Sequence, residues 1–389
     1  MSPIVGVLGA GQLGRMLALA AAPLGLRVRC FDAPDPSGDA PPAAQVADFF
    51  AGDFADEDAL RRFAEGCAAV TYEFENVPAR AAEVVARAAP LFPPAPALAA
   101  SQDRVAEKTL LNSLGVATPA WAEINSRADL DTAASIIGLP AVLKTRRVGY
   151  DGQGQAVLRT PADVGRAWTE LGIASDPGGP GLILEAFVPF EREVSILGVR
   201  GRPDASGRSP TVFSPLIENR HEGGILRLSR VGATASAAPE RNALATQAQG
   251  ACARLMESLG YVGVCCIEFF QVRDERGGPA LLANETACRV HNSGHWTIEG
   301  ARTSQFENHL RAIMGWPLAS AEPVGPCAMV NLIGATPPIE AVLAVEDAHP
   351  HFYGKRARAG RKLGHVTVLA PDEGTLDHRL RRVMAAIGG

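Results

Sequence analysis

The N-terminal segment constrains the fold more than any other, because it has the pattern of a βαβ unit. An unbroken apolar run at residues 4–8 is followed by the glycine segment GAGQLG, a helical pattern at residues 15–24 and a second strand that ends at Asp32. The three glycines match G-x-G-x-x-G, and Asp32 lies 18 residues after Gly14. On its own, this fingerprint predicts a dinucleotide site and suggests an NAD-dependent oxidoreductase.

Alternating helix and strand patterns continue for the rest of the N-terminal quarter of the chain. Residues 56–66 and 79–89 have helical periodicity, and the strand pattern between them ends near Glu73 and Glu75. The proline-rich stretch LFPPAP then interrupts the alternation and indicates a domain boundary, although it would also fit a connection inside one domain. We therefore expect a small doubly wound, Rossmann-like domain at residues 1–100.

The remaining chain predicts two further units, residues 101–315 and residues 316–389. Helices are expected at residues 103–114 and at the C-terminal end. Strands are expected at residues 141–144, 181–185, 193–200, 212–216, 262–272, 280–285 and 328–333. The predicted class is α/β, with α+β character in the central unit.

Composition excludes several classes of protein. With 389 residues, a net charge of −5 and 47% hydrophobic residues, the chain resembles ordinary globular enzymes, and it has no long Lys/Arg run for binding nucleic acid. No apolar stretch approaches the ~18 residues of a membrane span, and no basic leader precedes the first strand, so we expect a cytoplasmic protein with no membrane partner. The seven cysteines form no C-x-x-C pair and are expected to be reduced and mostly buried.

The segment LKTRRVGYDGQGQ, at residues 143–155, has the chemistry of a phosphate-binding loop. Lys144 would reach charged oxygens as a point cation, and the glycines would let backbone N–H groups close over phosphate oxygens. Only four lysines occur in the chain, so each is a candidate for a specific task. The alternative is a glycine turn with a solvent-facing lysine.

Two acids lie on neighbouring predicted strands. Side-chain alternation would allow Glu268 and Glu285 to face one cleft, with Asn284 beside the second acid. Such a pair suits a hard cation such as Mg²⁺ held between carboxylates and substrate phosphates. A buried salt bridge is the alternative.

Two polar segments are candidates for anion binding. RVHNSGH, at residues 289–295, contains Arg289, His291 and His295, of which His295 could equally be a structural histidine. YGKRARAGRKLGH, at residues 353–365, has five cations within eight residues and would suit a phosphate monoester, with a solvated basic loop as the alternative.

These segments together resemble a known family, the N5-carboxyaminoimidazole ribonucleotide synthetases, which are ATP-grasp ligases of de novo purine synthesis. The matching segments are GAGQLGRML, TYEFENVP, SQDR, KTRRVGYDGQGQ, EREVS, ENRHEGGIL, NETACRVHNSGHWTIEGARTSQFENHLRAI and YGKRARAGRKLGH. The resemblance implies an ATP-grasp architecture with an N-terminal Rossmann-like pre-ATP-grasp domain and a small C-terminal domain that carries the substrate-phosphate loop.

The resemblance also implies roles for individual residues. ATP would contact Arg104, Lys144, Gly149, Tyr150, Asp151, Gly152, Gln153, Gly154, Gln155, Glu185, Ala186, Phe187, Val188, Glu193, His221, Asn284 and Glu285. Magnesium, or manganese in its place, would bind Glu268 and Glu285. The ribonucleotide would contact Gln12, Leu13, Glu73, Lys355, Arg361 and Lys362. Catalytic roles would fall to Arg289, His291, Tyr150 and Asp151, and the N-terminal glycines would approach the ribonucleotide instead of a dinucleotide.

The implied reaction is the ATP- and bicarbonate-dependent carboxylation of 5-aminoimidazole ribonucleotide through carboxyphosphate, in a homodimer. A formate-dependent glycinamide ribonucleotide transformylase is the nearest alternative, and the HNSGHW pattern favours the carboxylase. The chain departs from the family pattern at Val148, Gln153, Cys288 and Ala359. Of these, only Gln153 replaces a proposed ligand, because a basic residue is usual there.

Overall fold

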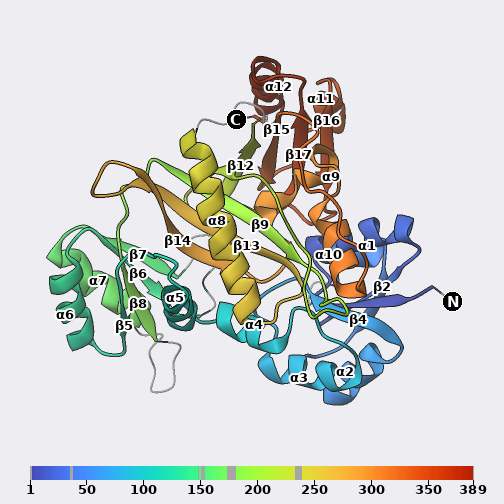
Figure 1. Cartoon of the computed structure of the whole chain (residues 1–389), viewed down its shortest axis with the longest axis horizontal. Coiled ribbons are helices and arrows are strands. Elements are labelled where there is room, and N and C mark those ends of the chain that lie inside the picture. The colour runs from blue at the N-terminus through green and yellow to red at the C-terminus, as the bar shows by residue number, and fades with distance from the viewer. Residues whose placement is uncertain are drawn as a thin grey trace.

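The computed structural model describes residues 2–35, 38–147, 149, 154–172, 181–232 and 239–388. Within these residues the chain forms three β-sheets with helices on their faces (Figure 1). The predicted glycine loop lies largely outside them, since Val148, Tyr150, Asp151, Gly152 and Gln153 are not described.

The N-terminal sheet confirms the predicted doubly wound unit. Its four strands are parallel, in the order β3-β2-β1-β4, and span Asp48–Ala51, Arg27–Asp32, Ile4–Leu8 and Cys67–Tyr72. Helix α1, Gln12–Ala21, packs on one face, and α2, Glu57–Ala64, and α3, Ala79–Ala88, pack on the other. Helix α1 begins three residues before the predicted start, because Gly14 in its first turn weakens the helical pattern there.

A second, antiparallel sheet forms a small lobe that is seen on the left in Figure 1. Its strands run in the order β5-β8-β6-β7 and span Trp121–Ile124, Leu182–Ala186, Ala141–Thr145 and Gln155–Leu158. Helices α6, Arg127–Ile137, and α7, Pro161–Gly172, bury leucine, valine and alanine side chains against it. Helices α4, Ala95–Ser101, and α5, Arg104–Ser113, precede this lobe in the chain.

The third sheet has nine strands and is antiparallel. Its order is β14-β13-β9-β11-β12-β15-β17-β16, with β10 beside β9. The strands are β9 Arg192–Arg200, β10 Thr211–Phe213, β11 Ile217–Glu222, β12 Ile225–Val231, β13 Gly263–Arg273, β14 Pro279–Ala287, β15 Cys327–Ile333, β16 Ala348–Phe352 and β17 Lys362–Leu369. This sheet continues across the predicted boundary at residue 315, so the C-terminal unit extends the central sheet.

Helices cover both faces of the large sheet. Helix α8, Pro239–Ser258, crosses the face that is turned toward the viewer in Figure 1, and α10, Gln305–Met314, packs between β13 and the N-terminal sheet. Helix α9, Thr297–Gly300, precedes α10, and α11, Ile339–Leu343, and α12, Glu373–Ala386, pack near the C-terminal strands.

His309 on α10 ties the N-terminal sheet to the large sheet. Its Nδ1 atom accepts a hydrogen bond from the Val264 N–H at 3.1 Å, and its Nε2 atom lies 2.9 Å from the Thr71 hydroxyl oxygen. Because Nδ1 is an acceptor, Nε2 carries the ring proton. Burial lowers the pKa of His309 to about 4, so the junction contains a neutral imidazole.

Candidate active site

A cavity of about 1000 Å³ opens where the three sheets meet. It gathers most of the residues predicted for the site. The predicted residues that line it are Gln12, Leu13, Glu73, Arg104, Lys144, Gly149, Gln155, Phe187, Glu193, His221, Glu268, Asn284, Glu285, Arg289, His291, Lys355, Arg361 and Lys362. Gly154, Glu185, Ala186 and Val188 are described but do not line it, and Tyr150, Asp151, Gly152 and Gln153 lie outside the described residues.

Glu268 and Glu285 face the cavity from adjacent strands, as side-chain alternation predicts. They are directly opposite each other in the β13–β14 register. Their contacts with basic side chains are long: His291 Nε2 lies 3.3 Å from Glu268, and Arg104 Nη1 lies 3.4 Å from Glu285. Burial, followed by the charge of Glu285, raises the pKa of Glu268 to about 7. The long contact with Arg104 therefore offsets only part of the negative charge of the pair.

This donor set fits magnesium. Among the described residues, no cluster of three or more His, Cys, Asp and Glu side chains has metal-binding geometry. Mg²⁺ commonly takes only one or two carboxylates from the protein and completes its shell with water and substrate phosphates. Two under-neutralised carboxylates at the wall of a large cavity match that requirement better than they match a closed, all-protein metal site. Glu193 on β9 lies close by, and its carboxylate is 2.9 Å from His221 Nδ1.

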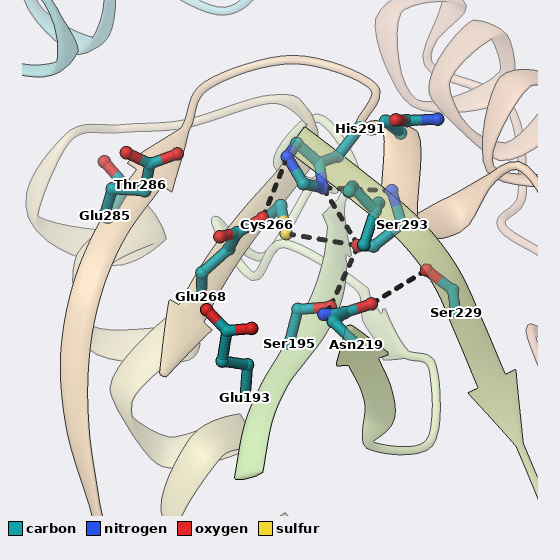
Figure 2. A network of polar contacts seen from close by, with 12 residues as sticks. Glu193, Ser195, Asn219, Ser229, Cys266, Glu268, Glu285, Thr286, His291 and Ser293 are labelled. Carbon is teal, nitrogen blue, oxygen red and sulfur yellow. Dashed lines mark hydrogen bonds and ion pairs between the residues drawn. The ribbon is translucent and has the colours of Figure 1, made fainter. Parts of the chain in front are cut away.

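A buried polar network orients His291 behind the acid pair (Figure 2). His291 Nδ1 lies 2.9 Å from the Ser293 hydroxyl oxygen and accepts a hydrogen bond from the Ser293 N–H at 3.2 Å. The Nε2 atom therefore carries the proton and points toward Glu268. Burial, together with the charge of Arg289, lowers the pKa of His291 well below its usual value, so the ring is neutral.

The rest of this network comes from strands far away in the sequence. Ser293 contacts Ser195 on β9 at 2.9 Å, Asn219 on β11 donates to Ser195 at 2.8 Å, and Ser229 on β12 donates to Asn219 at 2.8 Å. Sequence reasoning missed these residues, because isolated serines and asparagines in separate strands carry no motif.

Arg289 is held by an acid that the sequence analysis noted but did not assign to the site. Its Nε and Nη2 atoms contact the two carboxylate oxygens of Glu75 at 2.8 and 2.5 Å, which is a bidentate pair. Burial would raise the pKa of Glu75, but Arg289 outweighs that effect and lowers it. The guanidinium is thus fixed at the cavity wall with its plane set by Glu75.

The part of the cavity wall that the resemblance assigns to the nucleotide begins at the N-terminus of α5. Asp103 caps this helix by accepting from the Val105 N–H at 3.0 Å, and its second carboxylate oxygen contacts Arg146 Nη2 at 2.6 Å. Arg104 donates to the Gly149 carbonyl at 3.2 Å. These contacts attach the start of the glycine loop to α5.

Lys144 on β6 lines the cavity, and its Nζ atom lies 2.9 Å from Glu185 Oε2 on β8. The Glu185 carboxylate is only 3% exposed, and it contacts Lys144 and the buried Lys108 instead of lining the cavity. Of residues 185–188, which the resemblance placed at the adenine, Phe187 is the one whose side chain lines the cavity.

The N-terminal glycine loop is already hydrogen-bonded to an acidic side chain of the protein. The carboxylate of Glu73 accepts hydrogen bonds from the backbone N–H groups of Gly11 and Gly14, which are the donors that a pyrophosphate would use. A Cβ atom on Gly9 would lie 2.4 Å from Glu73 Cγ, so the acid fills the space above the loop. The dinucleotide interpretation of GAGQLG therefore has no anion site to support it.

The basic loop before β17 reaches the same region. Lys355, Arg361 and Lys362 line the cavity, and Lys355 donates to the side-chain oxygen of Gln12 at the start of α1. Arg356, next in the chain, points away to Asp39 at 2.9 Å. The loop thus places part of its charge at the cavity and part on the outer surface.

Three sequence families match successive parts of the chain. Residues 1–102 match the ribonucleotide synthetase preATP-grasp domain, residues 109–306 match the ATP-grasp domain, and residues 327–379 match the phosphoribosylaminoimidazole carboxylase C-terminal domain. The N5-carboxyaminoimidazole ribonucleotide synthase of Pseudomonas aeruginosa is 50% identical over 383 residues, which cover 98% of this chain and 99% of that protein. The chain belongs to the N5-carboxyaminoimidazole ribonucleotide synthase family.

Solved structures of this family have the same fold. The N5-carboxyaminoimidazole ribonucleotide synthetase of Thermus thermophilus is 51% identical, with a TM-score of 0.87 and coverage of 99% of both chains. The Aspergillus clavatus enzyme in complex with ADP and 5-aminoimidazole ribonucleotide is 30% identical, with a TM-score of 0.85 and coverage of 100% of this chain and 99% of that one. The predicted ATP-grasp fold class is confirmed, while the domain limits 1–100, 101–315 and 316–389 remain predictions.

Two further expectations concern the chain as a whole. All seven cysteines are free thiols, and six of them are buried. Within the part of the chain that the structure describes, no helix has the length and apolar character needed to cross a bilayer.

Proposed function

We propose that this protein is an ATP-dependent carbon–nitrogen ligase of de novo purine synthesis. It uses bicarbonate to carboxylate the exocyclic amine of 5-aminoimidazole ribonucleotide, giving N5-carboxyaminoimidazole ribonucleotide, ADP and phosphate. The observation that carries this proposal is one cavity, in a member of this family, that combines an acid pair, Lys144 and the basic loop. Complexes of relatives with ATP, and with ADP and 5-aminoimidazole ribonucleotide, support the choice of substrates.

The residues proposed to bind the nucleotide act by supplying charge and by positioning the phosphates. Glu268 and Glu285 are proposed to hold magnesium, which would neutralise negative charge on the nucleotide phosphates. Arg104 and Lys144 supply fixed positive charge on the same side. Phosphoryl transfer needs mainly such positioning and electrostatic stabilisation, because the protein takes no covalent part in it.

The carboxyl transfer takes place in two steps. Bicarbonate oxygen attacks the γ-phosphorus, ADP leaves, and carboxyphosphate forms. The exocyclic amine then attacks the carboxyl carbon of carboxyphosphate, or the CO₂ released from it. The C–N bond forms as phosphate leaves, and the proton lost by the nitrogen passes to the departing phosphate. Arg289, oriented by Glu75, is proposed to hold the carboxylate, and the neutral His291 offers an Nε2–H donor beside it.

The ribonucleotide is proposed to bind at the other end of the cavity. Lys355, Arg361 and Lys362 would hold its phosphate, and Gln12, Leu13 and Glu73 would contact the rest of it. Lys355 and Gln12 already touch, which brings the basic loop and the N-terminal domain to one substrate. Roles for Tyr150 and Asp151 stay predictions, because these residues lie outside the described residues.

The two alternative functions have less support. The NAD-dependent oxidoreductase needs the glycine-loop N–H groups that Glu73 occupies. The formate-dependent transformylase shares the architecture, but the relatives reported above are N5-carboxyaminoimidazole ribonucleotide synthases. A homodimer and a cytoplasmic location remain proposals, and light scattering of the purified protein tests the first.

ADP release with each substrate omitted in turn tests the proposed function. We expect ADP to form at the full rate only when Mg-ATP, bicarbonate and 5-aminoimidazole ribonucleotide are all present. Formate in place of bicarbonate is the control, and we expect it to be inactive. ADP release that depends on formate, or that ignores the ribonucleotide, would contradict the proposal.

A further inference from the structure

Lys108 is a buried lysine that no motif explains. It lies on α5, its side chain is 1% exposed, and it is the one of the chain's four lysines that does not line the cavity. Its Nζ atom donates to the backbone carbonyl of Asn284 at 3.0 Å and lies 3.5 Å from Glu185 Oε2. A buried ammonium is costly and needs a compensating partner or a function.

Lys108 and Lys144 share a single carboxylate oxygen. Lys144 Nζ lies 2.9 Å from Glu185 Oε2, and Lys108 Nζ lies 3.5 Å from the same atom. The second oxygen, Oε1, is buried without a hydrogen-bond partner among the described residues. Two ammonium groups and one carboxylate leave a net charge of +1, and only Lys144 presents it to the cavity.

Among the described residues, no acid other than Glu185 forms a salt bridge with Lys108 or Lys144, although the charge of Glu107 also acts on Lys108. Glu107, next to Lys108 in the chain, instead accepts hydrogen bonds from the N–H and the hydroxyl of Thr286, both at 2.6 Å. Burial lowers the pKa of Lys108, and the charge of Glu185 opposes that shift. Burial would raise the pKa of Glu185, but Lys144 and then Lys108 outweigh it and keep the carboxylate ionised.

The arrangement matters because Glu185 alone would neutralise Lys144. A buried ion pair at 2.9 Å presents little net charge to an approaching anion. With a second ammonium on the same oxygen, the pair becomes a cationic group of three. Lys108 also holds the backbone of Asn284, which lines the cavity together with its neighbour Glu285.

We propose that Lys108 is a positioning residue of the nucleotide site. Its ammonium group offsets the negative charge of Glu185, so that the positive charge of Lys144 remains available to nucleotide phosphates. This inference rests on the part of the proposed function that places Mg-ATP in this cavity. It assigns to Lys108 an electrostatic task that requires no contact with the nucleotide.

A double-mutant cycle tests the proposal, with Mg-ADP binding measured by calorimetry so that no turnover is needed. Lys108→Met removes the charge but keeps the length of the side chain, and we expect Mg-ADP to bind about tenfold more weakly. Adding Glu185→Gln removes the acid that would then neutralise Lys144. We expect the double variant to recover to within about threefold of the wild-type affinity.

This recovery separates charge from structure. A purely structural role would make the two changes add, so the double variant would bind no better than Lys108→Met. Leu111→Met, at a buried position on the same helix, is the matched control for a buried methionine and should bind as the wild type does. Wild-type affinity in Lys108→Met, or a double variant weaker than the single one, would overturn the inference.

Misfolding of a variant, or failure of the proposed reaction, can be distinguished from failure of the inference about Lys108. If Lys108→Met does not fold, the double variant is tested by itself, because it leaves no unpaired buried carboxylate. An Mg-ADP affinity close to that of the wild type supports the inference, and an affinity about tenfold weaker overturns it. Wild-type protein that binds Mg-ADP but makes no product from bicarbonate would contradict the proposed reaction and leave this inference standing.

Discussion

Glu73 and the pair Glu268 and Glu285 line the same cavity but differ in what their oxygens contact. Both oxygens of Glu73 accept backbone N–H groups of the glycine loop. Among the described residues, Glu285 has one ion pair, with Arg104 at 3.4 Å, and Glu268 lies 3.3 Å from the neutral ring of His291. Burial raises the pKa of both Glu73 and Glu268, so a raised pKa does not separate the two positions.

The difference lies in hydrogen-bond satisfaction. A carboxylate that already saturates a glycine loop is part of the structure of that loop, even when the loop carries a phosphate-binding motif. A carboxylate pair with little compensation has capacity left for a cation. A match to a binding motif is therefore weaker evidence for a ligand site than the number of hydrogen-bonding groups in the motif that the protein itself leaves without a partner.

The strongest test of this contrast is Glu285→Gln. The change keeps the size of the side chain but removes one anionic metal ligand, so we expect kcat/KM to fall about a thousandfold at ordinary magnesium concentrations. Steady-state kinetics with a magnesium titration would measure it. Glu218→Gln, an exposed acid on β11, is the matched control and should retain activity. Near-normal turnover of Glu285→Gln would remove the metal assignment.

Glu73→Gln tests the satisfied position. One acceptor oxygen becomes an NH₂ group that faces a backbone N–H, and we expect the free energy of unfolding to fall by about 2 kcal/mol. Denaturant unfolding would measure this loss, and Mg-ADP affinity should stay unchanged. Glu83→Gln, on the exposed side of α3, should leave stability within about 0.5 kcal/mol. Unchanged stability in Glu73→Gln would mean that the glycine loop does not depend on this carboxylate.

Lys355→Ala assigns a substrate to each side of the cavity. Because Lys355 touches Gln12 beside the Glu73 position, we expect KM for the ribonucleotide to rise about tenfold while KM for ATP changes less than twofold. Arg356→Ala is the control, since Arg356 points to Asp39 and does not line the cavity. A rise confined to the KM for ATP would reverse the proposed division.

Much of the fold could be predicted, and the exceptions have physical causes. Strand β1 and most of β13 are continuous buried runs, so their apolar letters predict them to within a residue or two. Helix α8 was not predicted, because its alanines, glutamines and glycine form no clear apolar stripe. Strands β11 and β12 were also missed, since their charged and polar residues hide the two-residue alternation.

The site divides in the same way. Glu268 and Glu285 face the same side because side chains alternate along two adjacent strands, and this alternation can be predicted from the sequence. The partner of Lys108 lies 176 residues away at Asn284, and Glu75 meets Arg289 across 214 residues. No local pattern links such residues, because only the tertiary fold brings them together.

The unbroken large sheet has a mechanical consequence. The acid pair on β13 and β14 and the basic loop that leads into β17 are joined by one hydrogen-bonded sheet. The intervening strands therefore set the distance between the proposed metal site and the proposed binding site of the ribonucleotide phosphate. Lys144 stands on a different sheet. Its distance from the acid pair is therefore set by tertiary contacts between the sheets, such as those of Lys108 with Glu185 and with the Asn284 carbonyl.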